Sequence, residues 1–128
     1  MKLKRVVVTG LGALTPIGIS IDEFWNNLLN GVSGADRITR FDTTKFKTQF
    51  ACEVKNYDSL TYFDRKEGRK YDLYAQYGIV ASDQAIADAS LNMATLDLDR
   101  CGVIWASGIG GILTFFDEVS AFVKGDGT

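Results

Sequence analysis

The sequence predicts an α/β fold built around a largely parallel β-sheet. Two uncharged apolar runs, at 6–8 and 102–106, have the composition of strands that are buried on both faces. Each run is followed by a glycine-rich loop and then by an amphipathic helix, at 20–31 and at 112–124. This alternation of strand, loop and helix is typical of proteins whose helices cover both faces of a parallel sheet.

The first of these helices has complete signals at both ends. Ser20 and Glu23 have the spacing of a capping box, and Ile19 and Phe24 are placed as a hydrophobic staple. Gly31 stands where a left-handed C-terminal cap is expected. These signals predict a helix that begins after Ser20 and ends before Gly31.

Two further helices are expected in the middle of the chain. Asp64 and Glu67 repeat the capping spacing and predict a short basic helix. A longer helix is expected at 72–90, where many residues are alanine or glycine. Glycine gains nothing from helix propensity, so these small residues indicate that a neighbouring backbone approaches closely. We expect 32–48 to be irregular, 49–54 to form a short strand, and the chain to end in a polar loop.

The composition excludes several classes of function. With a net charge of −2 and 46% hydrophobic residues, the chain is a packed protein and not a general nucleic-acid binder. It contains no histidine, so no Ser-His-Asp or Cys-His catalytic site exists within these 128 residues. Cys52 and Cys101 lack metal-ligand spacing, and we expect both to be small side chains buried on strands. No metal site and no cofactor are predicted.

The N-terminus has some features of a secretory signal, because Lys2, Lys4 and Arg5 precede an uncharged run at 6–21. Glycines and Pro16 interrupt that run, however, and a helix with clear end signals begins where cleavage would fall. No uninterrupted apolar run reaches the length of a membrane span. The sequence therefore predicts a cytoplasmic protein that makes no contact with a membrane.

Two glycine-rich loops have part of the fingerprint of dinucleotide-binding proteins. Gly10 and Gly12 follow a strand, but the helix opens only at Ser20, too late for its N-terminus to face a pyrophosphate. The second loop, at 108–111, has Leu113 where a third glycine is needed. The simpler interpretation is that the glycines let tight turns pack closely. A nucleotide-binding α/β module stays an alternative function.

Three segments together form a more specific pattern. The opening strand and loop read Val6-Val7-Val8-Thr9-Gly10-Leu11-Gly12 and then Thr15-Pro16-Ile17-Gly18. A basic segment reads Asp64-Arg65-Lys66-Glu67-Gly68-Arg69-Lys70-Tyr71-Asp72, and a glycine turn reads Ser107-Gly108-Ile109-Gly110-Gly111. In this order and spacing, the segments resemble the β-ketoacyl-acyl-carrier-protein synthases over all 128 residues.

The resemblance implies a thiolase-like layered fold, αβαβα in the whole enzyme, built from two similar halves. Residues 1–128 would form the N-terminal part of the first half, which is an incomplete domain. The implied reaction is a decarboxylative Claisen condensation of malonyl-acyl-carrier protein with an acyl thioester in fatty-acid elongation. The implied enzyme is a homodimer that needs no cofactor.

The resemblance assigns no catalytic residue to this chain. The nucleophilic cysteine and the two histidines of the family are expected beyond residue 128. Neither Cys52 nor Cys101 falls at the place of the nucleophile. We therefore expect the 128-residue chain to be inactive by itself.

Two binding assignments do follow from the resemblance. Ile109 matches the bulky gate at the mouth of the acyl pocket in the second-type synthases, where the first type usually carries glycine. Lys66, Arg69 and Lys70 match the patch that docks the acidic acyl carrier protein. Helical spacing places these three cations and Arg65 within one arc. From spacing alone, a solvated charged face is an equal alternative.

Other functions stay open at this stage. Within the same superfamily, the chain fits a polyketide ketosynthase or its inactive chain-length partner. From another class, it fits a non-catalytic interaction domain that uses the basic helix. No interaction with nucleic acid is predicted.

Overall fold

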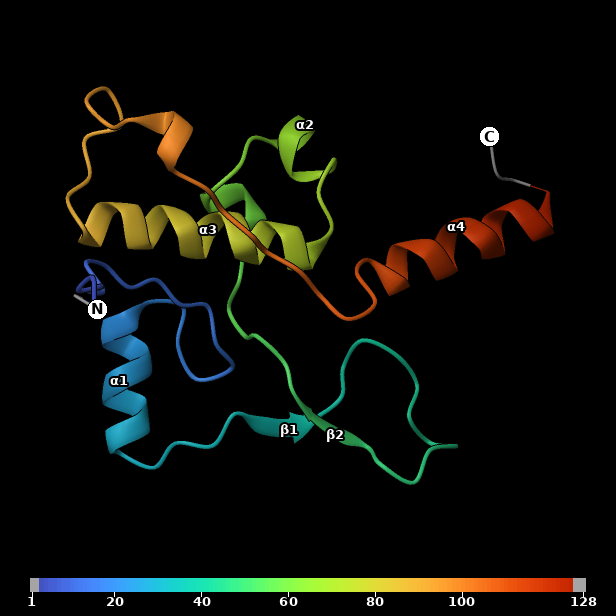
Figure 1. Ribbon diagram of the computed structural model, residues 1–128. Helices are drawn as coiled ribbons and strands as arrows, with labels where there is room; N and C mark the ends of the chain where they lie inside the picture. Colours follow the sequence, from blue (N-terminus) through green and yellow to red (C-terminus); the bar gives the residue numbers. More distant parts are fainter. Residues whose placement is uncertain (1–2, 126–128) are drawn as a thin grey trace.

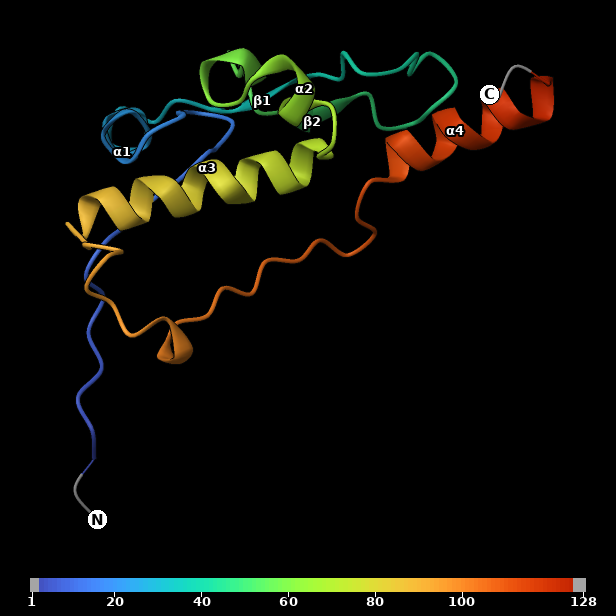
Figure 2. The same cartoon turned by 90° about the horizontal axis from the view of Figure 1, so that it is seen from above.

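In the computed structural model of the chain, residues 3–125 are described; Lys2 and the polar end at 126–128 lie outside this range. In chain order the elements are α1 (Ile21–Leu29), β1 (Ala35–Arg37), β2 (Phe50–Cys52), the 3₁₀ turn η1 (Ser59–Thr61), α2 (Arg65–Gly68), α3 (Leu73–Asp88), the 3₁₀ turn η2 (Leu98–Arg100) and α4 (Ile112–Lys124). Helix α3 runs through the middle of the molecule, whereas α4 extends away from it (Figures 1 and 2).

Helix α1 confirms the prediction from the end signals. The Ser20 hydroxyl accepts from the Glu23 N–H at 3.3 Å, and the Glu23 carboxylate accepts from the Ile19 N–H at 2.8 Å. The second bond goes to the residue before the N-cap, one position earlier than a capping box requires. Gly31 lies in the left-handed region at φ +68°, and its N–H donates to the Leu28 carbonyl at 3.1 Å.

The small residues of α3 confirm the predicted close approach of another backbone. A Cβ atom added to Gly12 would overlap the Ala81 carbonyl oxygen, and one added to Gly10 would overlap that of Ala85. The N-terminal loop therefore lies directly on the backbone of α3, at positions where neither partner has a bulky side chain.

Side chains of α3 satisfy the polar groups of this loop. The Leu11 N–H donates to the Asp88 carboxylate at 2.8 Å, and the Ala13 N–H donates to Oε1 of Gln84 at 3.0 Å. Nε2 of Gln84 in turn donates to the Ile19 carbonyl at 2.8 Å, just before α1 begins. A single glutamine thus fixes both ends of the loop.

A second segment lies along another part of α3. The indole N–H of Trp105 donates to the Tyr74 carbonyl at 2.9 Å. A Cβ atom at Gly78 would come within 2.6 Å of the indole ring. Figure 2 shows the extended chain that contains Trp105 running beside α3.

The predicted parallel sheet is not formed by residues 3–125. The segments at 6–8 and 102–106 have no strand partner, and Val6 and Ile104 are 93% and 98% exposed. A strand exists only through hydrogen bonds to a neighbour, and these two segments are apart: the one at 6–8 extends away from the molecule, whereas the one at 102–106 runs beside α3 (Figure 2). Over this range, the only paired strands are the antiparallel β1 and β2.

The β1–β2 pair partly corrects the sequence interpretation. Strand β2 falls within the predicted 49–54, but β1 lies in the segment that was expected to be irregular. Asp36 pairs with Ala51 at the centre of the register. The residues of β1 are all exposed and show no alternation of apolar and polar residues, so no pattern marks them as a strand.

The prediction that both cysteines are buried is wrong. Cys52 ends β2 and Cys101 follows η2, and both are exposed, unpaired thiols. Within residues 3–125 the burial pattern of β2 leaves Phe50 and Cys52 exposed. Cys101 lies in a turn, where its thiol donates to the Asp97 carbonyl at 3.3 Å.

Much apolar surface stays uncovered. In the described range the buried hydrophobic residues are Phe63 and Val80, whereas Phe122 and Val123 on α4 are 77% and 78% exposed. None of the helices described is long and apolar enough to span a membrane. The apolar faces of α4 and of the two unpaired segments need further protein to cover them.

We therefore predict that the 128-residue chain, expressed alone, associates or stays loosely packed. Contiguous apolar patches beyond about 600 Å² are rare on stable monomers. Analytical ultracentrifugation and binding of a hydrophobic dye measure this directly. A monodisperse monomer with a sharp, cooperative melting transition would contradict the prediction.

Candidate functional site

The predicted docking residues lie together on the surface. Lys66 is on α2, and Arg69 and Lys70 are in the turn that follows it. All three side chains are exposed, as is that of Arg65. Across residues 3–125, the ion pairs involve other residues, so none of these cations is neutralised by a carboxylate. Helix α2 itself ends at Gly68, and Arg69 is its C-cap residue. The four cations therefore do not lie on one continuous helix: two are on α2, and two lie at its end.

The basic turn, residues 65–70, is held in place by the residues on either side of it. The Asp64 carboxylate caps α2 by accepting from the N–H groups of Lys66 and Glu67, at 2.8 Å and 2.7 Å. This confirms the predicted cap at Asp64. Phe63, just before it, is 9% exposed, and its ring lies 6.1 Å from that of Tyr71.

A buried glutamine joins the basic turn to α3. Gln76 is 6% exposed, and its Nε2 donates to the carbonyls of Gly68 and Tyr71, at 2.8 Å each. Its Oε1 accepts from the Tyr57 hydroxyl at 2.9 Å, and burial raises the pKa of that tyrosine. Both the amide nitrogen and the amide oxygen of Gln76 therefore make hydrogen bonds that hold the chain between α2 and α3. A glutamine inside a helical pattern gives no sequence signal for this role.

The glycine turn carries the predicted gate residue. The Gly110 N–H donates to the Ser107 hydroxyl at 3.2 Å, and the Ile112 N–H donates to the Gly110 carbonyl at 3.0 Å. Gly110 has φ +73°, a conformation that favours glycine. Ile109 stands at the tip of this turn and is 76% exposed.

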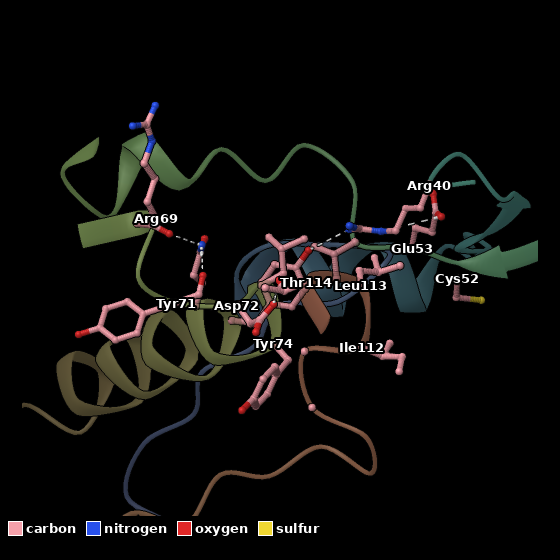
Figure 3. A pocket seen from close by; sticks show the side chains of 17 residues that line it. Arg40, Cys52, Glu53, Arg69, Tyr71, Asp72, Tyr74, Ile112, Leu113 and Thr114 are labelled. Carbon is pink, nitrogen blue, oxygen red and sulfur yellow. Dashed lines mark hydrogen bonds and ion pairs between the residues drawn. The ribbon is translucent and has the colours of Figure 1, made fainter. Parts of the chain in front are cut away.

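An open cleft of about 600 Å³ lies next to the turn. It is bounded by β2, by the junction of α2 and α3, and by the start of α4 (Figure 3). Gly110 and Gly111 line it, but Ile109 does not. Arg69 also contributes to its lining, although its guanidinium points outward in Figure 3. The cleft therefore separates the basic turn from the glycine turn.

One contact crosses this cleft. The Asp72 carboxylate accepts a hydrogen bond from the Thr114 hydroxyl, which lies in the first turn of α4. Figure 3 shows the two side chains meeting. The two residues are 42 positions apart, so local sequence patterns give no indication of the contact.

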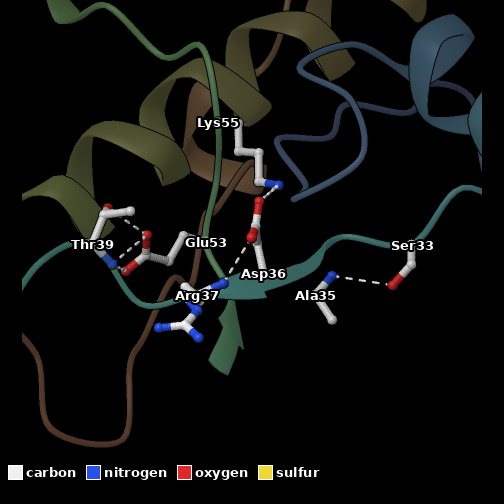
Figure 4. Close-up of polar contacts among 7 residues, drawn as sticks. All are labelled: Ser33, Ala35, Asp36, Arg37, Thr39, Glu53 and Lys55. Atoms are coloured by element: carbon white, nitrogen blue, oxygen red, sulfur yellow. Dashed lines mark hydrogen bonds and ion pairs between the residues drawn. The ribbon is translucent and has the colours of Figure 1, made fainter. Parts of the chain in front are cut away.

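The sheet side of the cleft is held by charged groups (Figure 4). The Thr39 hydroxyl donates to Glu53 at 2.7 Å and is the main reason why the pKa of that carboxyl is lowered. The Lys55 ammonium lies 2.9 Å from Asp36 and lowers the pKa of that carboxyl. Both carboxylates therefore stabilise the folded form when the pH is above their ordinary pKa values. This stabilisation is lost as the pH falls through the lowered pKa values of the folded form.

The first glycine-rich loop and the potential metal ligands bear on the nucleotide and metal alternatives. The Leu11 and Ala13 N–H groups, which a pyrophosphate would need, already donate to Asp88 and Gln84. From residue 3 to residue 125, no three potential ligands among His, Cys, Asp and Glu lie close enough to hold a metal ion.

Sequence comparison identifies clear relatives. A family model described as "Beta-ketoacyl synthase, N-terminal domain" matches residues 3–126. A 3-oxoacyl-[acyl-carrier-protein] synthase 2 of Staphylococcus aureus (strain COL) is 47% identical over 112 residues, which is 88% of this chain and 27% of the relative. The corresponding protein of Synechocystis sp. is 42% identical over 118 residues, 92% of this chain and 28% of the relative. The chain thus spans little more than a quarter of these relatives.

Two solved structures have a similar fold. The ishigamide ketosynthase/chain length factor matches with a TM-score of 0.74 at 28% identity, over 94% of this chain and 30% of its own. A type II PKS ketosynthase, in complex with its acyl-carrier protein and bound to the hexaketide, matches with a TM-score of 0.75 at 27% identity, over 98% and 32%. These matches confirm the predicted α/β, thiolase-like fold class.

Proposed function

The chain belongs to the β-ketoacyl synthase family, and on this premise we propose that it is a segment of a second-type 3-oxoacyl-acyl-carrier-protein synthase. The observation that carries the proposal is the 47% identity to the Staphylococcus aureus relative of that name over 88% of the chain. The proposed activity is that of an acyltransferase in fatty-acid elongation.

The proposed reaction has two stages. An acyl group moves from its carrier thiol to a cysteine of the enzyme, which becomes a thioester. Malonyl-acyl-carrier protein then loses carbon dioxide, and the resulting carbanion attacks the acyl carbonyl and expels the cysteine thiolate. These steps need an activated thiolate and hydrogen-bond donors for the carbonyl oxygen. Residues 1–128 include no histidine and neither Cys52 nor Cys101 is assigned, so this segment contributes scaffold and binding surfaces.

Lys66, Arg69 and Lys70 are proposed to dock the acyl carrier protein. Their exposure, and the lack of carboxylate partners for them among residues 3–125, support the proposal, because an acidic partner would relieve the repulsion among clustered like charges. One structural relative is a ketosynthase in complex with its acyl-carrier protein. Ile109 is proposed to gate the acyl pocket, and its place at the tip of a tight turn beside the cleft supports this.

The complete protein is further proposed to be a cytoplasmic homodimer. The uncovered apolar face of α4 supports an extensive contact with more protein. The two free, exposed cysteines fit a reducing compartment.

A polyketide ketosynthase or chain-length factor is the second candidate. Both structural relatives named above are of this kind, although their identities of 27–28% are well below those of the fatty-acid enzymes. The nature of the residue at the nucleophile position distinguishes a condensing enzyme from a chain-length factor.

The proposal is tested by incubating the full-length protein that carries this segment with acyl- and malonyl-acyl-carrier protein. We expect one 3-oxoacyl product and one carbon dioxide for each condensation, with saturated acyl chains as primers. The 128-residue chain alone should form no acyl-enzyme. Mass spectrometry detects both the 3-oxoacyl product and any acyl-enzyme. A covalent acyl adduct on Cys52 or Cys101 at the rate of turnover, or no product from the full-length protein, would contradict the proposal.

Charge reversal tests the docking assignment. Changing Arg69 and Lys70 together to glutamate should raise KM for carrier-protein substrates about tenfold or more, because steering by exposed charges governs the encounter. Activity with small thioester mimics should change little. The wild-type KM should rise with salt, since exposed charges are screened over about 8 Å at physiological ionic strength.

The matched control reverses Lys45 and Lys47, which are exposed in the loop before β2 and change the net charge equally. This control should leave KM for the carrier protein near its wild-type value. The docking assignment fails if both double variants raise KM equally, or if Arg69→Glu/Lys70→Glu lowers activity equally with carrier-bound and small substrates.

Substitution of Ile109 tests the gate. In the full-length protein, where further chain is expected to complete the acyl pocket around Ile109, Ile109→Phe should narrow that pocket, because an added ring in a filled apolar site costs about 1–3 kcal/mol. The kcat/KM for long primers should therefore fall more than that for short ones. Ile109→Leu, which has a similar volume, should keep the wild-type preference. Equal losses for all chain lengths would mean that Ile109 has only a structural role.

A further inference from the structure

Asp72 has a side chain that does not serve its own helix. It occupies the N-cap position of α3, with extended backbone angles of φ −60° and ψ 154°, yet it makes no hydrogen bond to the first turn of that helix. The carboxylate instead accepts from the Thr114 hydroxyl, in the first turn of α4. An aspartate that leaves its own cap unused is therefore engaged at the start of another helix.

The start of α4 is shaped to receive this carboxylate. Gly111 is the N-cap residue of α4 and has no side chain that could cap the helix. A Cβ atom at Gly111 would overlap the Asp72 carboxylate. A negative charge at a helix N-terminus is favourable, because the free N–H groups there carry partial positive charge. Asp72 thus places a negative charge beside the N-terminus of α4 and bonds the Thr114 hydroxyl there.

Asp72 is itself rigidly held. The residue before it, Tyr71, and the end of α2, Gly68, both accept hydrogen bonds from the buried Gln76. The segment at 68–76 therefore fixes the basic turn at one end and the first turn of α4 at the other. Ile109 lies two residues before Gly111, so its position depends on where α4 begins.

We infer that Asp72 is a positioning residue for acyl-chain selection. Its carboxylate anchors the start of α4 through Thr114 and Gly111, and so sets the place of Ile109 beside the cleft. This inference rests on the proposed role of Ile109 as the gate. It also connects the gate to the segment that carries the proposed docking residues.

The first test measures chain-length preference in the full-length protein. Asp72→Ala and Thr114→Val should each change the ratio of kcat/KM between long and short primers by about tenfold, which a hydrogen bond to a charged group can supply. Primers are given as small thioester mimics, so docking plays no part. The double variant should change this ratio no more than either single variant does, because both substitutions remove the same contact.

Two variants serve as controls in that assay. Thr114→Ser keeps the hydroxyl and should keep the wild-type ratio. Asp83→Ala removes an exposed carboxylate from the same helix and should also leave the ratio unchanged. The inference would be overturned if the ratio in Asp72→Ala stayed within twofold of wild type. It would also be overturned if Thr114→Ser did not keep the wild-type ratio.

The second test uses the close fit at Gly111. Gly111→Ala should displace the glycine turn, whereas the same change in an Asp72→Ala background should be tolerated better, since the carboxylate no longer occupies the space. Hydrogen exchange of residues 107–111 reports this without any need for activity. Equal increases in exchange with and without the Asp72 side chain would overturn the inference.

The two tests separate the inference from the proposed function. If the wild-type protein condenses no primer at all, the proposed function fails, and hydrogen exchange alone decides whether Asp72 holds the turn. If condensation proceeds with normal chain-length preference in Asp72→Ala, the proposed function stands and the positioning role is wrong.

Discussion

The fold depends on how closely other parts of the chain approach α3. Gly10 and Gly12 lie against the carbonyl groups of Ala85 and Ala81, with no room for a Cβ atom on the loop. This approach leaves the loop amides within reach of polar side chains on the helix, so Gln84 accepts from one of them. Larger residues at these positions would separate the two backbones and take the loop N–H groups out of reach of these side chains. The small residues and the polar anchors of α3 therefore act together.

The proposed docking turn and the glycine turn with the proposed gate both lie near the opposite end of the same helix. The buried Gln76 fixes the chain that leaves the basic turn, and Asp72 reaches across the cleft to α4. A carrier protein that docks on the basic turn would thus bind a segment that is directly connected to the glycine turn beside Ile109.

The sequence predicts well what is encoded by neighbouring residues. The cap at Ser20 and the one at Asp64 both form as expected, since each requires only side chains within three positions of the helix start. The small residues of α3 correctly indicate a close backbone contact. The pattern of three motifs also predicts the family and the fold class, which the relatives confirm.

Features that depend on residues far apart in the sequence cannot be predicted from local patterns. Gln76 and the Asp72–Thr114 contact join positions that only the fold brings together, so no local pattern marks them. Burial of Cys52 was expected from its residue type, but its strand lies in a two-stranded sheet and its side chain is exposed. The two apolar runs have the composition of buried strands, yet strand pairing needs a partner, and residues 3–125 provide none.

Because the loop after 6–8 and the segment at 102–106 both contact α3, we expect these two runs to assemble into a sheet on this helix in the full-length protein. A crystal structure of the full-length protein tests it most directly. We expect 6–8 and 102–106 to form parallel strands of one sheet packed on α3, with Gly12 still in contact with the Ala81 carbonyl. A structure in which these runs stay unpaired, pair antiparallel or lie away from α3 would contradict it.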